Sequence, residues 1–180
     1  CGVHPPFDHC TNNRLIKEGR QPSPWQHNCS GKHSGMLALA RLLAEPKENY
    51  LRLDRPVQQL IVNTCAEMFG IPVNQLKMGV DGCSAPVFAV PMRSAAEAYA
   101  KLCQPNQLSP RHAQACRTIT QAMMKHPFLV AGPKRFDTAM MQALPEKIIA
   151  KSGAEGYFGL GIMPNALYTG SIGLGIMIKI

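Results

Sequence analysis

Two short loops gather most of the side chains that could carry out chemistry. The segment HNCSGKHSG holds Cys29, Lys32 and His33, and the segment GVDGCSAP holds Asp81 and Cys83. A thiol beside acidic and basic groups in a polar, Gly-rich loop is typical of a metal or catalytic site, because a rigid scaffold displays such a loop to ligands. The simpler alternative is a set of helix caps, solvated charges and imidazoles with ordinary partners. From residue types alone, both interpretations stay open.

The first loop leads directly into a predicted helix. Its apolar face ends before Pro46 and consists of Met36, Leu37, Leu39, Ala40, Leu42 and Leu43. We expect Ser30 or Ser34 to cap the N-terminus of this helix, since serine is a preferred N-cap residue. The loop then lies at the positive end of the helix dipole, where a thiolate or a substrate carboxylate is stabilised.

The remaining cysteines do not form a framework of their own. Seven Cys is an odd number, and no pair has the C-x-x-C spacing of a zinc ribbon or the density of a disulfide scaffold. Cys65, Cys103 and Cys116 lie on the apolar faces of three predicted helices, so we expect these thiols to be packed in the core. The signals that start those helices are Pro56, a capping box at Ser94, and Pro110 after Ser109.

The C-terminal part of the chain has the residue pattern of β-strands, not of helices. Two Gly-rich, β-prone runs, residues 148–164 and 168–180, are separated at Pro164 and predict two adjacent antiparallel strands. With residues 1–145 mainly helical and residues 146–180 forming strands, the fold class is α+β in a single domain. Lys151 begins a K-S-G segment at the head of the first run, the form of an element in which a strand lysine faces a nucleophile. An ordinary edge-strand lysine would look the same.

Composition removes several function classes. The net charge is +8, but the Lys and Arg residues are scattered and only 6% of residues are aromatic, so nucleic-acid binding is not favoured. No run of 18 apolar residues and no signal-peptide pattern is present, so neither a membrane span nor export is indicated. We therefore expect a cytoplasmic protein that acts on a small molecule.

Five segments together carry a family resemblance. In order along the chain, they are CGVHPPFD, HNCSGKHSGML, DGCSAPVFAVPM, AGPKRFDTAMM and KSGAEGYFGLGI. With these segments the sequence resembles the asparaginase II family, the rhizobial-type L-asparaginases, which hydrolyse L-asparagine to aspartate and ammonia. The resemblance covers essentially the whole chain and implies a fold similar to the serine β-lactamases and class A glutaminases.

The resemblance implies a zinc site. In the family, zinc is held by the Cys and Lys of the C-S-G-K-H motif and the Cys of the D-G-C motif, which are Cys29, Lys32 and Cys83 here. Two thiolates and one nitrogen are acceptable to Zn²⁺ and leave a fourth position free. Asp81 and His33 flank these ligands and are expected to take part in catalysis, by orienting ligands or holding the substrate.

The resemblance also implies which residues take part in catalysis and in substrate binding. Lys151 matches the family lysine that partners a catalytic serine as base or proton carrier. Arg135 is a candidate for binding the substrate α-carboxylate, with a structural ion pair as the alternative, and Ser30 is a second candidate for substrate binding.

One family feature is missing from these residues. The S-x-x-K nucleophile motif lies upstream of CGVHPP in the family, and no serine here has a lysine three positions later. We therefore expect the chain to be a C-terminal part of an asparaginase whose nucleophile segment is absent, with an exposed sheet edge that favours a homodimer. The alternatives are a catalytically silent zinc-binding fragment, an assembly or interaction module, and redox sensing by Cys29 and Cys83.

Overall fold

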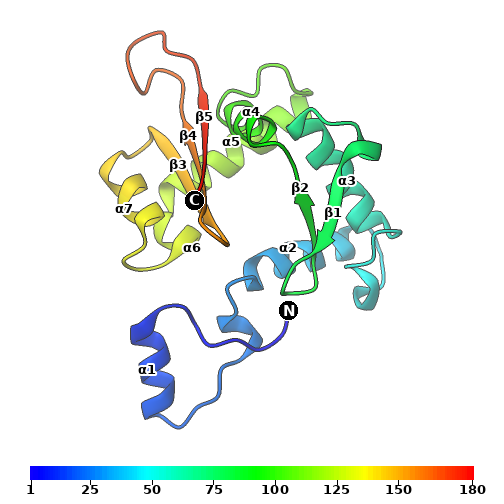
Figure 1. The fold of residues 1–180 in the computed structure, drawn as a ribbon, viewed down its shortest axis with the longest axis vertical. Helices are drawn as coiled ribbons and strands as arrows, with labels where there is room; N and C mark the ends of the chain where they lie inside the picture. The colour runs from blue at the N-terminus through cyan, green and yellow to red at the C-terminus, as the bar shows by residue number, and fades with distance from the viewer. The chain divides into compact units, whose positions relative to one another are not determined.

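A computed structural model describes residues 1–180 and divides them into two compact units (Figure 1). The first unit comprises residues 1–66 and 72–89, and the second comprises residues 67–71 and 90–180. Helices and antiparallel strands both occur, so the α+β prediction is confirmed. None of the helices combines the length and the hydropathy that a membrane span requires.

Three helices and one hairpin form the first unit, although the third helix ends across its boundary. They are α1 (His9–Lys17), α2 (Ser30–Leu42), α3 (Pro56–Phe69), β1 (Lys77–Val80) and β2 (Pro86–Ala89). Short 3-10 turns lie at Pro24–Gln26, Lys47–Asn49 and Val73–Gln75. The core of the unit contains Met36 and Ala40 from α2, Val57 from α3, and Cys83 and Ala85 from the hairpin turn. This core therefore holds the hairpin turn against α2.

The third helix begins and ends where the sequence predicted, but its buried face is different. Pro56 occupies its first position and Gly70 follows its last residue with φ +65°. Val62 and Ala66 are buried, whereas Cys65 is only half-buried, so the expectation that Cys65 is a core residue was wrong. The buried face of the helix is rotated relative to the predicted apolar face and includes Gln58, a polar residue that the apolar pattern could not indicate.

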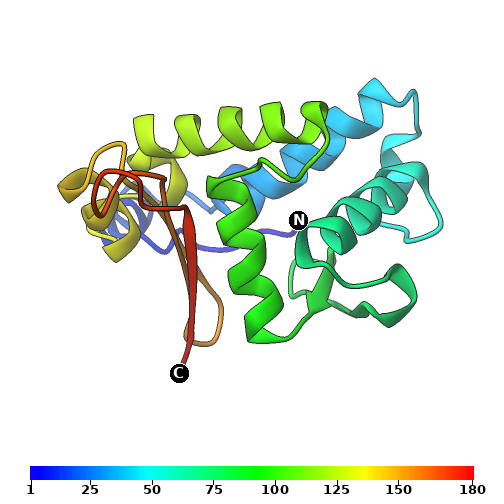
Figure 2. The same cartoon turned by 90° about the horizontal axis from the view of Figure 1, so that it is seen from above.

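The second unit is a three-stranded antiparallel sheet with helices packed on it. Its elements are α4 (Met92–Cys103), α5 (Pro110–Lys125), α6 (Pro127–Ala131), α7 (Phe136–Ala143), β3 (Ile148–Gly153), β4 (Tyr157–Ile162) and β5 (Leu174–Lys179). The strand order is β3-β4-β5, so β4 is central. Helix α4 runs alongside β5, and α7 lies beside the edge strand β3 (Figures 1 and 2). Cys103 and Cys116 are buried, as predicted.

Glycines let α4 approach the sheet very closely. A Cβ atom added to Gly175 would lie 1.9 Å from the carbonyl oxygen of Ala96, and one added to Gly159 would lie 2.6 Å from the Tyr99 ring. Both distances are far below any van der Waals contact, so the helix and strand backbones touch directly at Gly175, and the Tyr99 ring lies directly on the strand backbone at Gly159.

The first β-prone run folds into two strands instead of one. Residues 154–156 turn the chain between β3 and β4, and Gly156 adopts φ +70° there. Lys151 pairs with Gly159 near the end of β3, not at the head of a strand as predicted. The turn glycine supplies a conformation that other residues rarely adopt, and a single long strand would have placed it in a ladder.

Candidate functional site

The first reactive loop ends at the N-terminus of α2. Cys29 is the N-cap residue, and its backbone N–H donates to Nδ1 of His27 over 2.9 Å. The N–H of Ser30 donates to the His27 carbonyl over 2.9 Å, and Ser30 is already the first helical residue. The prediction that Ser30 or Ser34 caps this helix was therefore wrong. Instead, His27 accepts both hydrogen bonds at this helix end: its ring nitrogen accepts from the Cys29 N–H, and its carbonyl accepts from the Ser30 N–H.

The second reactive loop is the tight turn of the β1–β2 hairpin. Asp81 organises it: its backbone N–H donates to the Ala85 carbonyl, its carbonyl accepts from the Ser84 N–H, and its Oδ1 accepts from the Gly82 N–H over 2.8 Å. Cys83 is only 4% exposed and belongs to the core of the unit. The turn is thus fixed by its own hydrogen bonds and by burial of its single thiol, that of Cys83.

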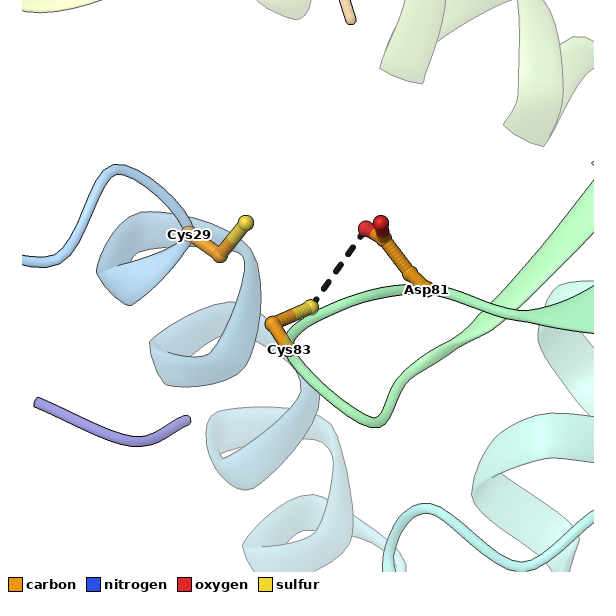
Figure 3. A group of neighbouring side chains, drawn as sticks. All are labelled: Cys29, Asp81 and Cys83. Carbon is orange, nitrogen blue, oxygen red and sulfur yellow. Dashed lines mark hydrogen bonds between the residues drawn. The ribbon is translucent and has the colours of Figure 1, made fainter. Parts of the chain in front are cut away.

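The two loops meet in one group of side chains. The sulfur atoms of Cys29 and Cys83 and a carboxylate oxygen of Asp81 all lie within 4.8 Å of one another, and Figure 3 shows the three side chains pointing toward one another. Asp81 Oδ2 accepts a hydrogen bond from the Cys83 thiol over 3.4 Å. The same oxygen accepts one from Lys32 Nζ over 2.9 Å. Four residues from the two loops, far apart in the sequence, therefore converge.

The charges in this group support one another. The Lys32 hydrogen bond lowers the pKa of the Asp81 carboxyl, against the effect of burial. Burial lowers the pKa of Lys32, but its hydrogen bonds with Asp81 and Cys83 outweigh that effect, so the net shift is upward. Burial and the neighbouring Cys83 raise the pKa of the Cys29 thiol. In the absence of a metal, the group therefore contains an ammonium–carboxylate pair beside the protonated thiol of Cys29.

The donor atoms of this group suit a zinc ion. Two cysteine sulfurs together with a carboxylate oxygen or an amine nitrogen are ligands that Zn²⁺ accepts, whereas Mg²⁺ and Ca²⁺ prefer oxygen alone. Asp81 offers a carboxylate oxygen as the third donor directly, whereas Lys32, whose ammonium donates to that oxygen, could ligate a metal only after losing a proton.

His33 belongs to a separate buried chain of contacts that sequence reasoning missed. It is 3% exposed, and its Nδ1 forms a 2.6 Å hydrogen bond with the Tyr50 hydroxyl. The buried Gln58 amide donates in turn to the Tyr50 carbonyl over 2.8 Å. Burial lowers the pKa of His33, which favours the neutral imidazole, and its Nε2 has no hydrogen-bond partner. No local pattern marked Tyr50, because it lies in a turn with no periodic element around it.

In the second unit, three charged side chains meet at Ser152. Lys151 Nζ donates to the Ser152 carbonyl, and Arg135, the N-cap residue of α7, donates from Nη2 to the Ser152 hydroxyl over 3.3 Å. The carboxylate of Asp137 accepts from the Ser152 backbone N–H. Arg135 forms no ion pair with a carboxylate. The alternative role given above, a structural ion pair, therefore lacks a partner residue in this fold.

Comparison with known proteins gives one clear result. A search of curated proteins found no match to this sequence. The family described as L-asparaginase II matches residues 1–180, which is the whole chain. The segments that carried the resemblance are thus supported by a match that runs through all of them, and the chain belongs to the L-asparaginase II family.

Proposed function

We propose that the protein is an L-asparagine amidohydrolase with a zinc site at the Cys29–Cys83 group and a proton carrier at Lys151. The observation that carries the proposal is the convergence of Cys29, Lys32, Asp81 and Cys83 in a chain that matches the asparaginase II family throughout. We further propose that the fold is of the serine β-lactamase type, to which an antiparallel sheet with a K-S-G strand is suited.

The proposed zinc ligands are Cys29, Cys83 and Lys32, with Asp81 as the group that orients Lys32. When bound, zinc would supply a positive charge able to polarise a substrate oxygen or to hold a substrate in place. Lys32 can ligate only after losing a proton, and its raised pKa makes that loss costly. Asp81 is therefore the competing third ligand, and replacing Lys32 with Met and Asp81 with Asn in parallel would distinguish the two assignments.

The proposed chemistry is acyl transfer followed by hydrolysis. A serine hydroxyl attacks the side-chain amide carbon of asparagine, and its proton passes to the amine of Lys151, which acts as the base. That proton then goes to the departing nitrogen, which leaves as ammonia. Water attacks the resulting ester and releases aspartate and the free serine. Backbone N–H groups would stabilise the negative oxygen in both steps.

Two further residues keep roles as candidates in substrate binding. Arg135 presents an exposed guanidinium with no carboxylate partner, which suits the α-carboxylate of an amino acid. Ser30 lies next to Cys29 at the start of α2 and is proposed to contact the substrate there.

The test is ammonia release by the protein expressed from its whole reading frame. L-asparagine and L-glutamine are compared as substrates, and the zinc content of each preparation is measured. We expect ammonia from asparagine, and we expect Lys151→Met to lower kcat by about a hundredfold or more. Lys147→Met, an exposed lysine just before the same strand, is the matched control and should retain activity. Zinc-loaded protein that releases no ammonia would refute the proposed activity.

A catalytically silent zinc-binding protein is the second candidate. The observation that favours it is that the thiol group, its hydrogen bonds and the core that holds it all lie within the first unit. One equivalent of bound zinc without ammonia release would support it. Sedimentation of the same preparations with and without zinc tests the expected homodimer and the assembly role, which predicts a dimer that persists after the metal is removed.

A further inference from the structure

The second unit buries one carboxylate that the proposed chemistry does not use. Asp137 is 1% exposed in the first turn of α7. A buried carboxylate is costly unless hydrogen bonds or charges satisfy it. Its hydrogen-bond partner is the backbone N–H of Ser152 on β3. The buried carboxylate of Asp137 is therefore hydrogen-bonded to β3, the strand that carries Lys151.

The position of Ser152 explains why a partner is needed there. β3 is an edge strand that pairs with β4 alone, with Lys151 opposite Gly159 and Ser152 opposite Phe158. The N–H groups along its outer edge have no neighbouring strand to receive them. Helix α7 packs along this strand, and Asp137 supplies the acceptor. One side chain takes the place of a missing strand at this residue.

Holding this N–H has a direct effect on Lys151. The peptide unit between Lys151 and Ser152 is planar, so fixing the N–H of Ser152 also fixes the Lys151 carbonyl. The only rotations left near this unit are those about the two α-carbons. The orientation of this one peptide therefore helps to set the directions in which the Lys151 and Ser152 side chains leave the strand.

We propose that Asp137 is a positioning residue that fixes the Lys151–Ser152 peptide and so aims the Lys151 amine. The catalytic consequence rests on the proposed function, in which Lys151 carries a proton. Arg135 and Lys151 also contact Ser152, but both are exposed, whereas Asp137 is held by the core around the buried Thr138 and Met141. Asp137 is therefore the fixed point of this group, and the other two side chains depend on it.

Three variants test this role in the whole protein. Asp137→Ala removes the acceptor, Asp137→Asn keeps an oxygen that can accept the same N–H, and Thr138→Val is the matched control. Thr138 is also buried on α7, and its hydroxyl donates to the Gly132 carbonyl over 2.7 Å, away from β3. The control thus loses one buried hydrogen bond of the same helix without touching the strand.

Two measurements are made on each variant. We expect Asp137→Ala to lower kcat by about tenfold to a hundredfold with little change in KM, because a small misplacement of a reacting group is enough for such a loss. Asp137→Asn and Thr138→Val should keep kcat within about threefold of the parent. Hydrogen exchange of the Ser152 amide, followed by NMR, should accelerate at least about tenfold in Asp137→Ala alone.

The outcomes separate this inference from the proposed function. If Asp137→Ala matches Thr138→Val in both kcat and Ser152 exchange, the positioning role is overturned even when Lys151→Met is inactive. An equal loss in Asp137→Asn and Asp137→Ala would also overturn it, because the accepting oxygen would then not be what matters. If Lys151→Met keeps full activity, the proposed role of Lys151 fails, and the Ser152 exchange rate still decides whether Asp137 holds the strand.

Discussion

Replacing Cys83 with Ser is the most direct perturbation of the proposed zinc site. The thiol of Cys83 lies within 4.8 Å of the Cys29 sulfur and the Asp81 carboxylate and donates a hydrogen bond to Asp81. Serine has nearly the same shape and keeps that hydrogen bond, but its hydroxyl is a poor zinc ligand. Cys65→Ser is the matched control, because Cys65 is a partly buried thiol of the same unit outside the group.

The expected loss of affinity follows from the number of ligands. Zinc bound by four protein ligands contributes about 10 to 16 kcal/mol in small zinc domains, which is about 3 kcal/mol per ligand. Losing one thiolate should therefore weaken zinc binding by about a hundredfold. Cys65→Ser should change the zinc affinity by less than about twofold, since its sulfur is not among the donors.

Competition with a chromophoric zinc chelator measures both affinities, and circular dichroism establishes that both variants are folded. An equal loss of affinity in Cys83→Ser and Cys65→Ser would refute the site assignment. Unchanged affinity in folded Cys83→Ser would refute it as well, because the remaining donors would then be sufficient or lie elsewhere.

Three further results are expected, each measurable by urea unfolding. Gly175→Ala should lower the free energy of unfolding by about 3 kcal/mol, because the new Cβ would meet the Ala96 backbone and neither partner is a flexible side chain; a change near zero would show that helix α4 can shift. Gly35→Ala should raise it by about 0.5 to 1 kcal/mol, since the position is helical and has open space around it, and a loss would contradict that geometry. Burial raises the pKa of Tyr99 to about 12, so the neutral hydroxyl stabilises the fold below the ordinary tyrosine value of 10.0, and this contribution is lost as the pH rises toward 12. Between pH 10 and 12 the parent protein should therefore lose about 2 to 3 kcal/mol of unfolding free energy that Tyr99→Phe does not lose. If the free energy of unfolding falls equally with pH in both proteins, the burial argument is refuted.

Strong local signals predicted helices α3 and α5, whereas the capping box expected at Ser94 was wrong, because α4 already begins at Met92 after Pro91. Pro56 and Gly70 bracket α3, and Ser109 caps α5 by accepting the His112 N–H, so both helices begin where the sequence indicated. These signals act within one turn of the chain and need no tertiary context.

The β1–β2 hairpin was missed for a physical reason. Its strands have four residues each, and every side chain of β1 is exposed, so no alternation of apolar and polar residues marks them. The Asp81–Gly82 pair was a usable signal, because Asp-Gly is common in hairpin turns.

The site could be predicted only in part. Cys29, Lys32, Asp81 and Cys83 were named through the family resemblance, since no rule of spacing links residues so far apart. The capping role of His27 was not predictable from residue preferences, because histidine is not a common cap. Asp137 lies in AGPKRFDTAMM, one of the segments that carry the family resemblance, yet its partner is a backbone N–H, and such partners depend on tertiary contacts that leave no trace in residue type.

The contact of α4 with the sheet also limits how the second unit can move. Side chains between a helix and a sheet normally act as a compliant layer that absorbs small displacements by changing rotamers. At Gly175 that layer is missing, and at Gly159 it consists of the Tyr99 ring alone, so sliding or rolling of α4 meets backbone atoms or an aromatic ring at once. Helix and strands should then fluctuate as one stiff body, and amides of the central strand should exchange with solvent only when the whole unit opens.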